Sequence, residues 1–114
     1  MRVVSSQVER PPTLAAMEPT FEFPATTWLH PKGSWVFLTV PDDESEEIRD
    51  IAPHPGGFGS VRVRVSVGGS VWKTSLFPQR NDGPYVLPLK KDIRRRENIE
   101  VGDTVEVALT ILID

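Results

Sequence analysis

Cationic side chains gather in one short stretch of this sequence, between residues 90 and 96. The stretch reads KKDIRRR, in a protein whose formal net charge is −3. On a helix, Leu89 and Ile93 share one face. The opposite face is then formed by Lys90, Lys91, Arg94 and Arg95. Such a face can bind the phosphate backbone of nucleic acid, or it can be a solvated corner of the fold.

A second group of cations is predicted on a β-hairpin. Residues 60–67 read SVRVRVSV, and Gly68-Gly69 is typical of a two-residue hairpin turn before residues 70–77 return. This register turns the valines inward and sets outward-facing cations directly opposite one another, at a cost of about half a kcal/mol. It predicts a site for an anionic small molecule or protein partner, formed by Arg62, Arg64, Lys73 and Ser75. Neutralisation by the acidic run at 42–47 is the alternative.

The remaining polar motifs predict local structure and no catalytic residues. The acidic run follows Pro41, which is typical of a first helical turn, and it lacks the spacing of a calcium loop. Residues 53–60 are glycine-rich but lack the Lys-Ser/Thr of a Walker loop, and His54 has no acid or nucleophile at a recognisable spacing. Without cysteine there is no thiolate zinc site. We expect no metal and no cofactor, while an enzyme with a pocket inside the fold is kept as an alternative.

The elements that must position these side chains are mostly strands. β-rich or alternating runs occupy residues 21–29, 34–40, 60–67, 70–77, 85–89 and 103–114. Short helices are predicted near 42–51 and 89–98. Six strands with one buried face and little helix to cover the other indicate a mainly all-β fold, a small closed or nearly closed six-stranded β-barrel. The tryptophans, which fall in these strands, are expected to pack in the core.

The length of 114 residues predicts a single folded domain. Residues 1–19 contain three prolines and no period, which predicts a flexible leader before a barrel domain at 20–114. No apolar run is typical of a signal peptide or long enough to span a bilayer, so we expect a soluble cytoplasmic protein without membrane contact. The composition leaves the oligomeric state open.

Four motifs give the body of the chain a family resemblance. They are W-x-F-x-x-V-P at 35–41, G-G-S-x-W-K-T-S at 68–75, Y-x-L-P-L-K-K-x-I-R at 85–94 and G-D-x-V-x-V at 102–107. In this combination, residues 21 to about 113 resemble the small bacterial β-barrel family known as domain of unknown function 1905. The resemblance implies a six-stranded barrel and carries no activity or functional residues.

A shorter likeness covers residues 93–103, IRRRENIEVGD. It resembles the I-R-x-x-x-G-φ-x-x-G-D segment of transition-state-regulator and antitoxin DNA-binding hairpins, with Asn98 in place of glycine, Glu97 at an apolar position and Pro88 two residues too far upstream. The likeness implies a nucleic-acid-binding regulator that uses the basic helix. The net charge of −3 and the acidic run oppose that function. The favoured hypothesis is therefore a binding or accessory module with a cationic face.

Overall fold

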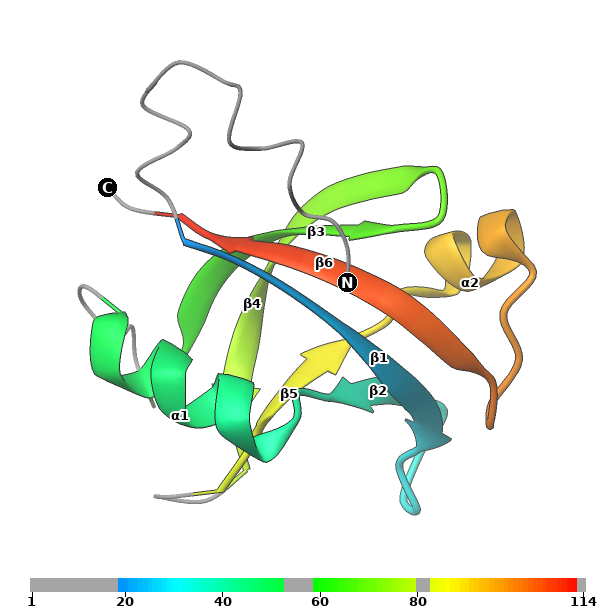
Figure 1. Cartoon of the computed structure of the whole chain (residues 1–114). Coiled ribbons are helices and arrows are strands. Elements are labelled where there is room, and N and C mark those ends of the chain that lie inside the picture. Colours follow the sequence, from blue (N-terminus) through cyan, green and yellow to red (C-terminus); the bar gives the residue numbers. More distant parts are fainter. Residues whose placement is uncertain (1–18, 53–58, 80–82, 113–114) are drawn as a thin grey trace.

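A computed structural model describes residues 19–52, 59–79 and 83–112, and these form a closed antiparallel β-barrel with two short helices (Figure 1). The strand order around the barrel is β1-β2-β5-β4-β3-β6. The elements are β1 (Thr20–Leu29), β2 (Val36–Thr39), α1 (Asp42–Ile51), β3 (Val61–Val67), β4 (Ser70–Pro78), β5 (Tyr85–Pro88), α2 (Lys91–Glu97) and β6 (Thr104–Ile111). The predicted fold class, six-stranded barrel and both helices are confirmed. The predicted leader lies almost wholly outside the described residues.

The alternation of apolar residues along the strands fills the barrel interior. Since successive side chains point to opposite faces of a strand, every second residue of β3 and β6 faces inward. Val63, Val65, Leu109 and Ile111 are completely buried there, and Leu38 meets them from β2. The interior formed by the described residues is thus filled mainly by aliphatic and aromatic side chains.

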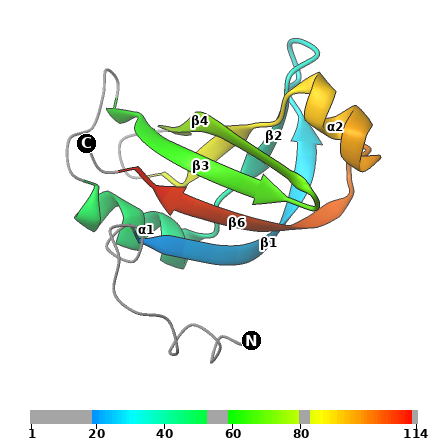
Figure 2. The ribbon, with the colours of Figure 1, turned by 90° about the horizontal axis from the view of Figure 1, so that it is seen from above.

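The two helices close opposite ends of the barrel, as two perpendicular views show (Figures 1 and 2). At one end α1 inserts Ile48, which is fully buried. At the other end α2 contributes Ile93, and Ile99 follows it into the core. Neither helix is long and apolar enough to cross a membrane, a statement that covers the described residues alone.

The wall between β4 and β5 is paired over only two positions, Phe77↔Val86 and Pro78↔Tyr85. Along β5, backbone N–H groups point alternately to β2 and to β4. Leu89 donates its N–H to the Val36 carbonyl on β2, so the next residue after Val86 whose backbone faces β4 is Pro88. Proline has no N–H to donate, so the ladder stops. Helix α2 contacts β4 in this region and protects part of its open edge.

The hairpin tip between β3 and β4 is held by a carboxylate of α2. Glu97 accepts hydrogen bonds from the Ser70 hydroxyl at 2.5 Å and from the Gly69 N–H at 3.3 Å. Gly68 has φ +59°, a left-handed conformation that L side chains rarely adopt. A Cβ at Gly68 would overlap the Glu97 carboxyl group. Glycine at position 68 is therefore required both by the backbone conformation and by the approach of α2.

We expect Gly68→Ala to lower the free energy of unfolding by roughly 1–3 kcal/mol, because it forces a left-handed alanine and displaces Glu97. Gly33→Ala is the matched control, since nothing lies within 4 Å of a Cβ there. That control should change stability by less than about 0.5 kcal/mol. Urea melts of both variants measure the difference. Equal melts would contradict both the backbone strain and the displacement of Glu97 expected at position 68.

The expected burial of the tryptophans is only partly correct. Trp72 packs against the core, but Trp35 precedes β2 and is 60% exposed. Trp28 is half-buried on the outer face of β1. The hypothesis failed because aromatic and β-branched residues favour strands on either face, so residue type alone does not tell the inner face from the outer one.

Candidate binding surfaces

The first predicted cation group lies where the hairpin register placed it. Arg64 is the cross-strand partner of Lys73, and Arg62 is the partner of Ser75. Arg62 and Lys73 are exposed and Arg64 is half-buried. Arg62 Nη1 donates a long hydrogen bond of 3.4 Å to Ser75 Oγ. The four residues therefore meet on the outer face of β3 and β4, and their binding of an anion remains a prediction.

The second group is carried by α2 and the residue before it. Lys90 occupies the N-cap position, and Lys91 and Arg95 project into solvent. Arg94 is half-buried and its Nε donates to the Leu89 carbonyl at 3.4 Å, so only part of its guanidinium faces outward. Arg96, which the face assignment left out, is exposed as well. The helix thus presents a cluster of cations, called the basic end below: Lys90, Lys91, Arg94, Arg95 and Arg96.

The end of α2 explains how so many like charges are tolerated. Arg94, Arg95 and Arg96 fall in the last turn, where the helix dipole favours positive charge. Asn98 ends the helix in the left-handed conformation (φ 60°, ψ 44°) and donates its N–H to Arg94 and Arg95 carbonyls. Asn98, which stands in place of the glycine of the DNA-binding hairpin pattern, thus forms a left-handed helix cap. Glu97, which departs from the DNA-binding hairpin pattern, is the residue that holds the β3–β4 turn.

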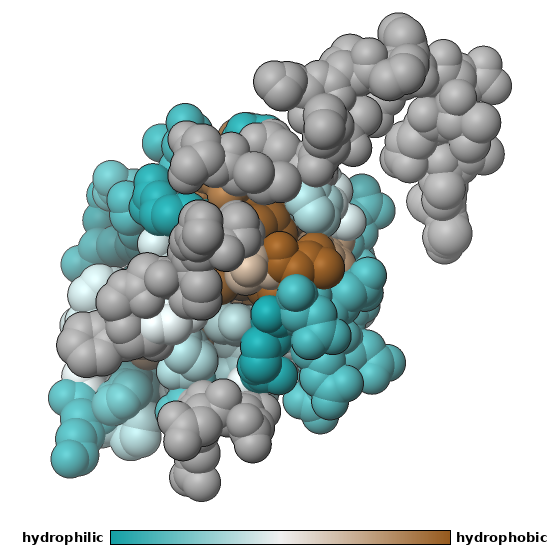
Figure 3. All heavy atoms as spheres, turned by 90° about the vertical axis from the view of Figure 1, so that its left-hand side faces the viewer, coloured by the Kyte–Doolittle hydropathy of each residue, from teal (hydrophilic) through white to brown (hydrophobic). Residues whose placement is uncertain are grey.

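Charge is segregated between the two ends of the barrel. Helix α1 (DDESEEIRDI) carries six carboxylates and one arginine, whereas α2 with its N-cap carries five cations and two carboxylates. These helices lie at opposite ends of the molecule (Figure 1). The face seen from the α1 side is largely hydrophilic, with one apolar area (Figure 3). A net charge of −3 therefore conceals an acidic end and a basic end.

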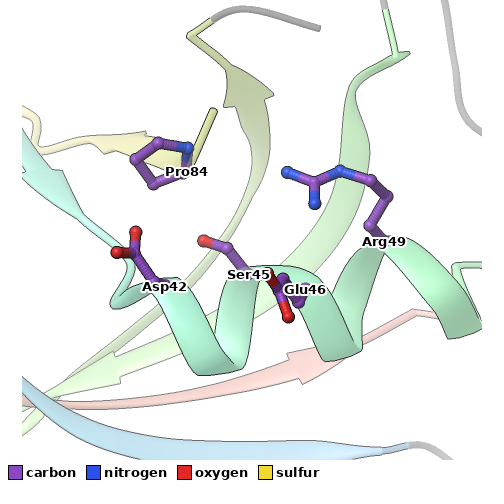
Figure 4. Close-up of a pocket in the computed structure, with 5 residues that line it drawn as sticks. All are labelled: Asp42, Ser45, Glu46, Arg49 and Pro84. Carbon is purple, nitrogen blue, oxygen red and sulfur yellow. The ribbon is translucent and has the colours of Figure 1, made fainter. Parts of the chain in front are cut away.

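A small pocket of about 230 Å³ lies beside α1 (Figure 4). It is lined by Asp42, Ser45, Glu46, Arg49 and Pro84, and two of these residues, Ser45 and Arg49, have structural partners. The Ser45 hydroxyl donates to the Val40 carbonyl at 3.1 Å and accepts from the Tyr85 N–H at 3.0 Å. Arg49 donates to the Gly83 carbonyl at 2.6 Å and lies over the Tyr85 ring. These contacts dock α1 on β5. The hydroxyl proton of Ser45 points to a backbone carbonyl and not to a side-chain base, so this serine lacks the geometry of an activated nucleophile.

The other residues considered for chemistry do not converge. Among the described residues, no three His, Asp or Glu side chains are grouped so that they could hold a metal ion. His30 lies in the turn after β1, where its Nδ1 accepts the Lys32 N–H at 3.1 Å. His54 and most of the glycine-rich segment lie outside the described residues.

The structure assembles an outer surface that the sequence interpretation missed, referred to as the aromatic strip: Trp28, His30, Trp35 and Phe37. The Trp28, His30 and Trp35 rings lie 5.2, 6.1 and 6.3 Å from the Phe37 ring, centroid to centroid. Its signal was present in the sequence as aromatic residues at every second position, 28 and 30, then 35 and 37. On strands that flank a turn, these positions share one face.

Comparison with known families gives one result. The family model described as "Domain of unknown function (DUF1905)" matches residues 23–109, which is most of the chain and includes every strand and both helices at least in part. A comparison with curated protein sequences found no match.

Proposed function

The chain belongs to the DUF1905 family, and we propose that it is a binding module that holds an anionic ligand against its basic end. The interior formed by the described residues is packed, and Ser45 and Arg49 of the α1 pocket are engaged in structural hydrogen bonds. Non-catalytic binding on the outside of the barrel is the function these features support best.

The observation that carries this proposal is the segregation of charge. A net charge of −3 would repel an anion if it were spread evenly. The strands have up to ten residues, so the ends of the barrel are on the order of 20 Å apart. The Debye length at physiological salt is about 8 Å, so the carboxylates of α1 are screened from a ligand at α2. The net charge of −3 therefore opposes the binding of an anion at α2 only weakly.

Duplex DNA is a suitable first probe, because its phosphates are exposed and its bases are stacked inside. We expect a fluorescently labelled duplex to bind with a slope of log K against log salt of about −3 to −4, if about four cations of the basic end each contact a phosphate. Reversal of the exposed pair, Lys91→Glu with Arg95→Glu, should abolish this binding and leave the melting temperature nearly unchanged, because both side chains project into solvent.

The matched control reverses the exposed cations of the hairpin face, Arg62→Glu with Lys73→Glu. It makes the same change in net charge at the other predicted site. Loss of binding in this variant, with the α2 variant unaffected, would move the site to the hairpin face. Absence of salt-dependent binding to any polyanion at low ionic strength would refute the proposed function.

A further inference from the structure

The aromatic strip lies on the outer face of β1 and β2, where solvent reaches it. Trp35 is 60% exposed, and its ring stacks on Phe37 at an interplanar angle of 24°. Trp28 is fixed beside them, since its indole Nε1 donates to Thr39 Oγ1 at 2.8 Å. Trp35 is contiguous with three partly exposed rings, and contiguous apolar surface of this kind is typical of a contact with a partner. The strip is anchored to the barrel wall, because Val36 and Leu38, which flank Phe37 in β2, are buried in the core.

Cations adjoin the aromatic strip. Phe37 pairs with Pro88, and the ladder continues with the hydrogen bond from the Leu89 N–H to the Val36 carbonyl. Extended by one residue beyond this hydrogen bond, the register sets Trp35 opposite Lys90, the first residue of the basic end. Val36 and Leu89 point inward, so Trp35 and Lys90 both face outward. Lys32, in the turn before Trp35, is exposed. The strip therefore runs directly into the basic end.

We infer that the ligand of this surface is a single-stranded nucleic acid, with bases stacked on the aromatic strip and phosphates on the basic end. This inference rests on the proposed function and names its ligand class. Flat aromatic side chains next to a cationic track are the two elements that single-strand binding requires, because every base has a face that can stack. A duplex hides those faces, so it can use only the cations.

The test compares a labelled single strand of about ten nucleotides, as DNA and as RNA, with a duplex of the same length. Single-stranded probes should bind more tightly than the duplex and should quench tryptophan fluorescence. Trp35→Ala should weaken single-strand binding by roughly 5- to 100-fold and leave duplex binding and the salt slope unchanged. Lys91→Glu with Arg95→Glu should weaken the binding of the single-stranded and the duplex probes alike. The DNA and RNA arms identify which strand is preferred.

Two control variants keep the result interpretable. Val71→Ala removes an apolar side chain that is as exposed as Trp35, 60%, on β4. It should leave binding unchanged, and Trp35→Phe should restore most of the affinity because it keeps a flat ring. Melting curves confirm that each variant is folded.

Four results would overturn the inference. Single-strand binding that is insensitive to Trp35→Ala, or duplex binding as tight as single-strand binding, would leave the proposed function intact and remove the stacking role. A Trp35→Ala variant that only converts a dimer to a monomer in solution would assign the strip to a second copy of the chain. Absence of binding to all nucleic-acid probes, with another polyanion bound at the basic end, would also refute it.

Discussion

Leu109→Ala should lower the free energy of unfolding by about 2–5 kcal/mol, the range for a leucine removed from a packed core. Leu109 is completely buried at the centre of β6, between the cross-strand partners Phe21 of β1 and Val65 of β3. All three side chains point into the barrel, so the cavity left by the truncation cannot be filled from solvent. A domain of this size is stabilised by only about 5–15 kcal/mol, and the variant would lose a large part of that.

Leu29→Ala is the control for Leu109→Ala, because it makes the same chemical change at the end of β1, where the side chain is 49% exposed. We expect it to cost less than about 1 kcal/mol. Chemical denaturation with tryptophan fluorescence measures both. Losses of similar size would contradict the packing of the barrel interior.

Trp72→Ala should cost about 3–5 kcal/mol, because this indole packs against the core from β4 and faces Val65 on β3. The outward neighbour behaves differently. Lys73→Ala should change stability by less than about 0.5 kcal/mol, or stabilise the protein slightly, since it removes a cation placed opposite Arg64. Denaturant melts of the two variants decide the matter.

Two further variants separate the ring of Trp72 from its N–H group. The Nε1 atom is buried and has no hydrogen-bond partner among the described residues. Trp72→Phe keeps an aromatic ring and removes this unsatisfied donor, so it should cost clearly less than Trp72→Ala. Trp35→Ala removes an equally large but 60% exposed side chain and should have little effect on stability. If Trp35→Ala were as costly as Trp72→Ala, the aromatic strip would be a structural feature and not a free surface.

The cationic hairpin shows how far local pattern can determine geometry. Alternation in SVRVRVSV and the Gly-Gly turn fix which residue faces which, since a two-residue loop allows one register. The pairs Arg64↔Lys73 and Arg62↔Ser75 were predictable on those grounds, and the structure has both. The left-handed cap at Asn98 was predictable for the same local reason.

The amino-acid sequence by itself determined the strands, the helices, the hairpin register and the barrel class, because each of these follows from side-chain periodicity and turn chemistry within a few residues. It did not determine that the acidic helix α1 and the basic helix α2 lie at opposite ends of the barrel. The separation of α1 from α2 and the position inferred for Lys90 opposite Trp35 depend on pairing between distant segments of the chain, for example Phe37↔Pro88. The pairing of β2 with β5 brings the aromatic strip toward the basic end, and this neighbourhood depends on the strand order around the barrel, which no local pattern encodes.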